Sequence, residues 1–191
     1  MEIDSWRIIN IKLSVKIPKK SLSEWILKCE ERGWTYKSCG NFIIIYPTER
    51  LRYSVFGGKI DAESQHINIS GVANRLEIII AERLLAQLFG TSIVHWTRII
   101  DCVTFQWKFD SRKIDIRKLY RLARDKRIQA RLNFEKFPGL LLRFRIKYKQ
   151  LATAIIYSSG CAIVFNCRSH RECIVTLHHL KIFLACMLGN F

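Results

Sequence analysis

Basic and apolar residues alternate in one stretch of the C-terminal half of the chain. The basic residues are Arg143, Arg145, Lys147 and Lys149, and the residues between them are Phe144, Ile146 and Tyr148. Successive side chains of a β-strand point to opposite faces, so this alternation predicts a strand with one cationic and one apolar face. A row of cations on a sheet can bind phosphate groups, although a merely solvated sheet face has the same pattern.

Two aromatic residues lie at the predicted ends of strands near this row. Phe137 begins the segment Phe137-Pro138-Gly139, in which proline fixes φ and glycine relaxes the backbone. Tyr157 precedes the turn Ser158-Ser159-Gly160, which predicts a hairpin with the run Ala162–Phe165. Aromatic residues beside a basic sheet suggest a wedge into nucleic acid. In the simpler interpretation, Phe137 anchors a turn and Tyr157 caps a hairpin.

The overall charge points to the same class of partner. The 191 residues include 32 Lys+Arg and 16 Asp+Glu, which gives a formal net charge of +16. Such an imbalance predicts a polyanionic partner, because each cation placed on a phosphate releases counterions. The alternatives are a basic surface that serves solubility or an acidic protein partner. A hydrophobic content of 49% with 12% aromatic residues is typical of a folded protein with a core.

The cysteines and the hydropathy pattern restrict the environment. The seven cysteines are odd in number and mostly lie in apolar runs, which predicts buried free thiols in a reducing, intracellular compartment. The N-terminal segment lacks the pattern of a signal peptide. No uncharged run approaches the ~18–20 residues that a membrane span requires, so we expect no membrane association.

No motif in the sequence predicts catalysis or a cofactor. Phosphate-binding loops, HExxH, GxSxG and paired carboxylates are missing, so we expect a protein that is not an enzyme. Cys167, His170 and Cys173 have a spacing that could bind zinc together with His178 and His179. However, Cys173 falls at the position that Ile78 occupies in a second, similar helix, so a core thiol without metal is the preferred interpretation.

That similarity belongs to an internal repeat. Asn74 and Ser169 lie 95 residues apart (169 − 74 = 95), and each is followed three positions later by a glutamate, which predicts two helices that begin with a capping box. Phe42 and Phe137 have the same offset (137 − 42 = 95). The sequence therefore predicts two repeats of one unit, residues 1–95 and 96–191.

The periodicities predict an α+β fold. In the first half we expect a strand at Ile9–Ile17, a helix from the cap Ser21 to Glu31, strands at Thr35–Tyr36, Phe42–Tyr46, Arg50–Phe56 and His66–Ser70, and a helix at Arg75–Leu88. In the second half we expect a strand at Cys102–Phe109, a helix at Asp115–Ala123, strands within Ala130–Phe165, and a helix at His170–Met187. The architecture inferred is a pseudo-two-fold, duplicated, curved antiparallel sheet with helices on one side.

The residues FPGLLLRFR, followed by TAIIYSSGCAIVFNC, resemble the second repeat of the TATA-box-binding protein (TBP) family. The chain looks most like the divergent TBP-like (TBP-related factor) members, and the resemblance extends over nearly the whole chain at low identity. It implies the TBP saddle, with helices on the convex face and double-stranded DNA bound through its minor groove on the concave face.

In that family two aromatic residues of each repeat insert between base steps. By resemblance, Phe137 and Tyr157 are the pair of the second repeat. Phe42 belongs to the first pair, and its partner is Phe56 if the sequence FGGK forms the family's turn. The partner is instead Ile60 if the turn lies at Asp61–Gln65.

The resemblance also implies which residues face the groove floor. Asn10 matches a family asparagine on the first strand, and Ser70 takes the place of a family threonine. In the second repeat Ile100 takes the asparagine position and Phe165 the threonine position, so hydrogen bonding to bases would be lopsided. Lys12 replaces a small apolar residue there. With the phosphate-contacting Arg143, Arg145 and Lys147, these residues complete the predicted DNA surface, for which we expect no strict TATA preference.

The same resemblance predicts protein partners. Family members bind general transcription factor IIA at the first repeat and factor IIB at the loop before Phe137. In this loop Glu135 keeps a family acid, whereas Lys136 replaces an apolar residue, so we expect weakened contact with factor IIB.

The expected function is therefore a nuclear, DNA-bending platform for transcription initiation. Two alternatives stay open. One is a protein-interaction module that has lost DNA binding, and the other is a single-stranded RNA or DNA binder that stacks bases on its aromatic residues.

Overall fold

The computed structural model describes residues 5–57, 63–90, 97–109, 114–135, 137–147 and 150–188, without the side chains of residues 144–147, 150, 151, 187 and 188. Ten strands and four helices lie in these ranges. In chain order they are β1 (Ser5–Pro18), α1 (Leu22–Glu31), β2 (Thr35–Cys39), β3 (Phe42–Tyr46), β4 (Arg52–Phe56), β5 (Ser64–Val72), α2 (Arg75–Phe89), β6 (Thr97–Lys108), α3 (Ile116–Asp125), β7 (Gln129–Leu132), β8 (Gly139–Lys147), β9 (Gln150–Tyr157), β10 (Cys161–Cys167) and α4 (His170–Leu188).

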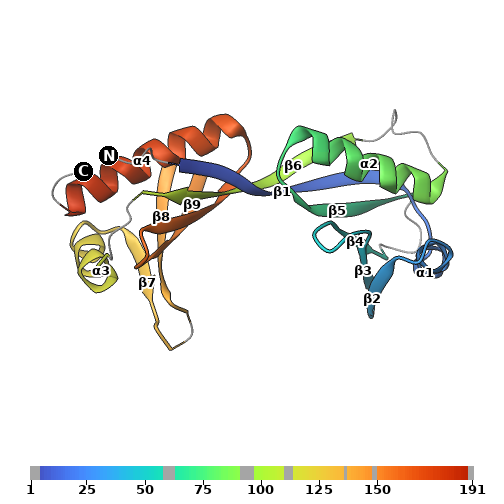
Figure 1. Cartoon of the computed structure of the whole chain (residues 1–191), viewed down its shortest axis with the longest axis horizontal. Helices are drawn as coiled ribbons and strands as arrows, with labels where there is room; N and C mark the ends of the chain where they lie inside the picture. The colour runs from blue at the N-terminus through green and yellow to red at the C-terminus, as the bar shows by residue number, and fades with distance from the viewer. Residues whose placement is uncertain are drawn as a thin grey trace. The chain divides into compact units, whose positions relative to one another are not determined.

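The chain forms two compact units (Figure 1). The first unit is Ile9–Asp101, and the second unit consists of Met1–Ile8 and Cys102–Phe191. Each unit has the same chain order of a strand, a short helix, four strands and a long helix. Because β1 begins in the second unit and β6 begins in the first, the units differ from the predicted repeats 1–95 and 96–191. Descent of the units from one duplicated segment stays a prediction.

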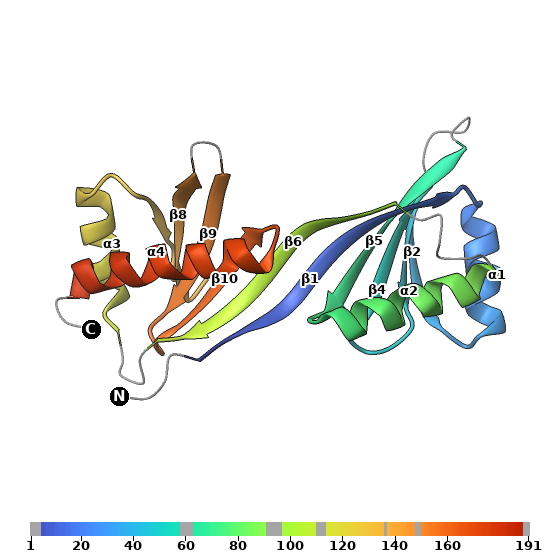
Figure 2. The same ribbon diagram turned by 90° about the horizontal axis from the view of Figure 1, so that it is seen from above.

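Backbone hydrogen bonds join the strands into one sheet in the order β2-β3-β4-β5-β1-β6-β10-β9-β8-β7. The neighbouring strands whose register is described pair antiparallel. In each unit the long helix lies across one side of the strands (Figure 2). The predicted α+β class, with an antiparallel sheet and helices on one side, is confirmed. None of the described helices is long and apolar enough to cross a membrane.

The core of each unit is the layer between the strands and the long helix. In the first unit it is formed by alternate residues of the strands, such as Leu13 and Val15 of β1, against Leu85 of α2. In the second unit Phe105 of β6 packs in the corresponding layer with Leu180 of α4. Complete burial of one such side chain stabilises the fold by roughly 1.5–3 kcal/mol. The strand alternation seen in the sequence therefore decides which face of each strand is covered.

Both long helices begin as predicted. In α2 the Asn74 side chain accepts the backbone N–H of Glu77 at 2.9 Å, and the Glu77 carboxylate accepts the N–H of Ala73 at 2.7 Å. In α4 the Ser169 hydroxyl accepts the N–H of Glu172 at 3.2 Å. Caps of this kind satisfy N–H groups that have no partner inside the helix.

Just before these helices, β5 and β10 contain matching irregularities. The backbone has positive φ at Gly71 (88°) and Asn166 (68°), which lie 95 residues apart (166 − 71 = 95). At Gly71 an added Cβ would lie 1.9 Å from the carbonyl oxygen of Arg50, so no side chain fits there. Each irregularity interrupts the ladder to the neighbouring strand, β1 for β5 and β6 for β10. Because a bulge shifts register, it also changes which residues lie side by side across the sheet.

The predicted bounds differ most at β6, which begins at Thr97 and not at Cys102. The added residues are largely exposed and do not alternate in polarity, so periodicity did not reveal them. Tertiary contacts hold them in place. Arg98 donates to both carboxylate oxygens of Glu82 on α2 at 3.2 Å, and Asp101 accepts a hydrogen bond from Ser14 of β1.

Candidate nucleic-acid interface

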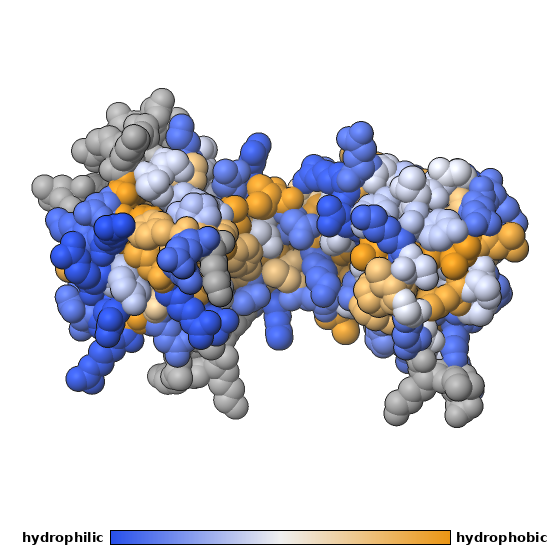
Figure 3. Space-filling view, turned by 90° about the horizontal axis from the view of Figure 1, so that it is seen from below, coloured by the Kyte–Doolittle hydropathy of each residue, from blue (hydrophilic) through white to orange (hydrophobic). Residues whose placement is uncertain are grey.

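Each unit has a sheet face directed away from its buried layer, which we call its open face. The helices of each unit lie on the opposite side (Figures 1 and 2). Seen from below, the surface of each unit combines apolar patches with hydrophilic side chains around them (Figure 3). The open face is therefore a sheet surface of mixed polarity whose residues are only partly buried.

An aromatic pair lies at one end of the open face of the first unit. Phe42 of β3 and Phe56 of β4 are opposite each other in the antiparallel register, and their ring centroids are 5.8 Å apart. Phe56 is 44% exposed, a large fraction for a phenylalanine. Of the two partners that the sequence allowed for Phe42, the structure brings Phe56 into contact. The alternative, Ile60, lies outside the described residues.

A second aromatic pair lies on the second unit. The ring centroids of Phe137 and Tyr157 are 6.0 Å apart. Tyr157 of β9 is opposite Gly139 of β8, two residues beyond Phe137. A Cβ built on Gly139 would lie 2.8 Å from Cε1 of Phe137, so the Phe137 ring covers the place where a side chain of residue 139 would be. The phenylalanine thus faces Tyr157 from outside the strand.

The register shows how the two pairs correspond. Val55 of β4 is opposite Ile43 and Ile67, and Ile156 of β9 is opposite Leu140 and Ala162. Val55 and Ile156 therefore occupy matching positions, and Phe56 and Tyr157 each follow them by one residue. By the same register Phe42 corresponds to Gly139, not to Phe137 as the offset of 95 implies. The Phe137 ring nevertheless occupies the space next to the tyrosine, which is why both units carry an aromatic pair.

Asn10 is held in a defined orientation on β1. Its Oδ1 accepts the backbone N–H of Gly71 at 2.7 Å, at the bulge of β5. Since an N–H donor must face the amide oxygen, this contact fixes which end of the amide is the NH2 group. Ser70, the neighbour of Gly71, is half-buried on β5 opposite Arg52. The oxygen of Asn10 is thus occupied within the protein, and its NH2 end is the part suited to a hydrogen-bond acceptor on a ligand.

In the second unit Cys102, and not Ile100, corresponds to Asn10. The Cys102 Sγ accepts the backbone N–H of Asn166 at 3.3 Å, just as Asn10 accepts that of Gly71. The register agrees, because Ile11 is opposite Val72 and Val103 is opposite Cys167. The prediction for Ile100 is wrong because the central strands are offset by 92 residues (103 − 11 = 92), whereas β5 and β10 are offset by 95 (167 − 72 = 95).

The floors of the two open faces differ in chemistry. In the first unit Ser14 Oγ lies 2.9 Å from Asn68 Oδ1 and also contacts the Asp101 carboxylate. In the second unit the corresponding strands β6 and β10 carry Gln106 and Ile163, which are opposite each other in register. Sequence reasoning missed Asp101, because nothing in its local sequence indicates that it reaches β1.

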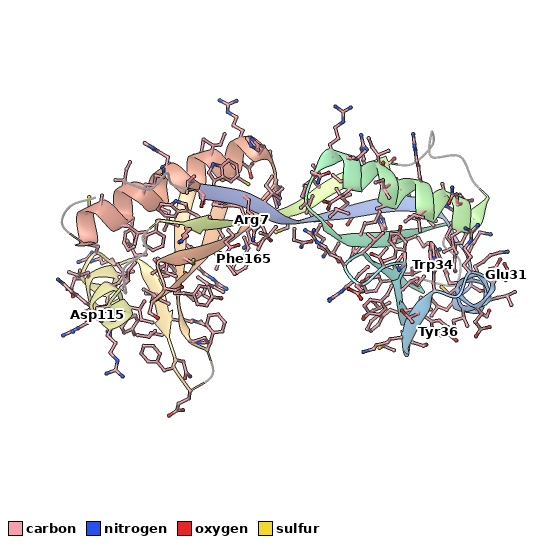
Figure 4. All side chains as sticks on the ribbon, viewed as in Figure 1. Arg7, Glu31, Trp34, Tyr36, Asp115 and Phe165 are labelled. Atoms are coloured by element: carbon pink, nitrogen blue, oxygen red, sulfur yellow. The ribbon has the colours of Figure 1, made fainter. Side chains whose placement is uncertain are left out.

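Phe165 adds to the apolar floor of the second unit. It lies on β10 (labelled in Figure 4), is half-buried and faces Thr153 of β9 in the register. Arg7, also labelled in Figure 4, donates to Gln106 at 3.3 Å on β6 of the same unit. Asn166 also donates to the Thr153 hydroxyl at 3.4 Å, so hydrogen-bonding groups lie both at β6 and on β9 beside Phe165.

The predicted cations are only partly described. Arg143 of β8 is exposed, and Lys12 of β1 is half-buried. The backbone at Arg145 and Lys147 belongs to β8, but the ladder to β9 shifts register between these two residues. The uniform alternation assumed from the sequence therefore does not extend to Lys147. The side chains of Arg145 and Lys147, and Lys149 as a whole, lie outside the described part of the structure.

The predicted partner loop lies between β7 and β8. Glu135 is exposed, and its backbone N–H donates to Asn133 Oδ1 at 3.2 Å. Phe137 N–H donates to the Asn133 carbonyl at 2.8 Å, which closes the turn. Glu135 is thus presented to solvent by a hydrogen-bonded turn. Lys136 lies outside the described residues.

The cysteines considered as zinc ligands lie in the core of the second unit. Cys167 and Cys173 are fully buried, and Cys167 Sγ lies 3.6 Å from Thr176 Oγ1. The hydrogen bond between the two thiols raises the pKa of Cys173 and lowers the pKa of Cys167, so the two cysteines interact with each other in the core. Among the described residues no group of three or more His, Cys, Asp or Glu side chains is arranged to hold a metal ion.

Comparisons with known proteins find a protein of similar fold but no matching family model or curated sequence. No family model and no curated protein sequence matches the chain. Among solved structures, TBP from Methanococcus jannaschii superposes with a TM-score of 0.72 at 15% identity, over 94% of this chain and 98% of that one. A rolling circle replication initiator protein from Geobacillus stearothermophilus reaches a TM-score of only 0.42 at 11% identity, over 98% and 85% of the two chains, which is too low to support an argument. The chain therefore has a TBP-like fold.

Proposed function

We propose that this protein binds duplex DNA through the minor groove with its open faces and bends it, as a non-enzymatic, TBP-like factor in transcription initiation. The observation that carries the proposal is the presence of an aromatic pair on the open face of each unit, with ring centroids 5.8 and 6.0 Å apart. Apolar side chains that insert between base steps unstack them and kink the duplex. The TBP-like fold and the formal net charge of +16 support the same function.

The proposed residue roles follow from the two faces. Phe42, Phe56, Phe137 and Tyr157 act as wedges, and Arg143, with Arg145 and Lys147, contacts phosphates. Asn10 offers its NH2 group to acceptors on the groove floor, where A·T pairs present only acceptors and guanine adds a donor. Cys102 is a poor donor, so base recognition would come mainly from the first unit.

A bending assay tests this proposal. Duplexes with a dye at each end, with and without a TATA element, are titrated at about 100 mM salt, where phosphate contacts still contribute strongly. We expect a bent complex with both duplexes. Phe56→Ala and Tyr157→Ala should each weaken binding about tenfold or more, since base–aromatic stacking contributes about 1–3 kcal/mol.

Phe134→Ala is the matched control, because Phe134 is 46% exposed but contacts Arg117 of α3 outside the aromatic pairs. Equal loss in the control and the wedge variants would contradict the assigned roles. Stronger competition by single strands than by duplex would favour a single-stranded binder.

One observation favours a second candidate, an interaction module without DNA binding. The Asp101 carboxylate lies next to Ser14 on the open face of the first unit, where it would repel phosphates. In this case the duplex would not bind, and affinity for general transcription factor IIA would remain. In either case we propose factor IIA as a partner, a weakened contact of factor IIB at Glu135, and a nuclear location.

A further inference from the structure

A cavity of about 330 Å³ lies in the second unit between α4 and the end of β6. Its walls are formed by Trp107, Phe109, His178, Lys181, Ile182, Leu184 and Ala185. Trp107 belongs to the buried layer, so the cavity opens on the helix side of the sheet and not on the open face.

The first unit fills the corresponding layer with aromatic side chains from its helices. There Trp25 of α1 is fully buried, and its ring centroid lies 3.8 Å from that of Phe89 of α2. Trp25 is the fourth residue after the N-cap Ser21, as Leu119 is after the N-cap Asp115. The second unit therefore has a leucine where the first has a tryptophan.

On the long helices, too, the second unit has a leucine where the first unit has an aromatic residue. Phe89 and Leu184 lie equally far from their caps (89 − 74 = 15 and 184 − 169 = 15). On the central strands the larger side chain belongs to the second unit. By the offset of 92, Trp107 of β6 corresponds to the smaller Val15 of β1 (107 − 15 = 92). The aromatic side chains of the second unit thus come from the strand and not from the helices, and space remains beside α4.

The chemistry of the cavity is that of an anchor pocket with a cationic edge. Trp107 and Phe109 form one wall with ring centroids 4.7 Å apart, and Lys181 Nζ lies 5.7 Å from the Trp107 ring. None of the lining residues is acidic. Ligand pockets are on the order of 300–1,000 Å³, so this cavity has room for about one or two side chains.

An exposed apolar stripe continues from the cavity along α4. Ile174 and Ile182 are 48% and 51% exposed, and they lie eight residues apart (182 − 174 = 8) with His178 between them. Residues four apart share one helix face, so the stripe and the cavity form one continuous surface. A free small molecule would leave the stripe uncovered, whereas a polypeptide segment covers both.

We propose that this surface binds an acidic segment of a partner protein, which inserts one aromatic side chain into the cavity. The apolar walls take the ring, and Lys181, in a chain of net charge +16, faces the carboxylates. The site goes beyond the proposed DNA binding, because it lies on the other side of the sheet and does not require DNA.

Fluorescence anisotropy with labelled, end-blocked peptides tests the site on the full chain. One peptide has carboxylates around a phenylalanine, a second has alanine in place of phenylalanine, and a third has lysines in place of the acids. We expect the first to bind about tenfold tighter than either of the others, because anchor side chains dominate such interfaces. Equal binding of the alanine peptide would overturn the anchor, and equal binding of the lysine peptide would overturn the acidic partner.

Two variants locate the binding. Leu184→Phe restores the residue type of the first unit and should lower affinity about tenfold by filling the cavity. Ile182→Glu repels the peptide from an exposed position that the fold does not need, so it provides the same test if Leu184→Phe is unstable. Lys181→Gln should weaken binding, whereas Arg171→Gln, with the same charge change elsewhere on α4, should not. Unchanged affinity in both Leu184→Phe and Ile182→Glu would overturn the proposal.

Discussion

Gly139 has no room for a side chain, and the variant Gly139→Ala tests how tightly the residues around it are packed. A Cβ at this position would lie 2.6 Å from Cγ2 of Ile155 and 2.8 Å from Cε1 of Phe137. Carbon atoms are in optimal contact at about 3.5–4.0 Å, so the methyl group is roughly 1 Å too close to both. Ile155 is β-branched and lies between Leu141 and Ile163 in the ladder, so we expect the Phe137 ring to move first.

The size of the effect follows from two opposing contributions. Overpacking of a well-filled site costs about 1–3 kcal/mol. Alanine also restricts the unfolded chain, which stabilises the protein by about 0.4–1 kcal/mol where the backbone is compatible, and Gly139 does not have a positive φ. We therefore expect the free energy of unfolding to fall by about 1–2 kcal/mol. Because the displaced ring belongs to the aromatic pair, DNA bending should fall as well.

Urea denaturation measures the fall in the free energy of unfolding, and the bending assay measures the fall in DNA bending. Gly57→Ala is the matched control beside the aromatic pair of the first unit. Its Cβ would meet mainly the end of the Asn41 side chain, with Oδ1 at 2.3 Å, and that side chain can turn away. The double variant Gly139→Ala/Ile155→Ala should recover part of the combined loss, because Cγ2 is removed. An unchanged stability of Gly139→Ala would refute the packing argument.

Three further predictions concern stability and reactivity. In urea denaturation, Arg98→Met should destabilise the protein more than Glu82→Met. Arg98→Met leaves the Glu82 carboxylate, which is only 7% exposed, without its partner, whereas Glu82→Met leaves only the exposed guanidinium of Arg98. Hydrogen bonds from the N–H groups of Lys118 and Arg117 lower the pKa of Asp115, so its contribution to stability is present above the unfolded pKa and is lost as the pH falls through the folded value. Asp115→Asn should therefore show a smaller loss of stability on acidification to about pH 2, as seen in urea midpoints. Burial raises the pKa of the Cys29 thiol to about 11, so mass spectrometry after alkylation at about pH 8 should find exposed Cys186 modified and Cys29 unmodified while the chain is folded.

Much of the fold could be predicted because its signals are local. The alternation in β1 is written in consecutive residues, and so are the caps at Asn74 and Ser169. The aromatic residue Tyr157 was also recognisable, because it directly precedes the turn Ser158-Ser159-Gly160. Strand β6 was placed too short for the same reason, since its first residues carry no periodic signal and depend on contacts with Glu82 and Ser14.

Residue correspondence across the sheet required the tertiary structure. The bulges at Gly71 and Asn166 and the 92-residue offset of the central strands decide that Cys102 corresponds to Asn10. A constant offset of 95 cannot reveal this, because register is set by pairing between residues far apart in the chain. The placement of the Phe137 ring over Gly139 likewise depends on strand β9.

By itself the sequence determined the class of fold, the faces of its strands and the positive charge, because these depend on residue type and on spacing along the chain. Only the tertiary structure decided which aromatic residues pair, that Asp101 reaches the open face, and that the second unit has a cavity beside α4. These features arise where strands and helices distant in the chain meet, and their geometry depends on register and on the sizes of side chains packed against each other.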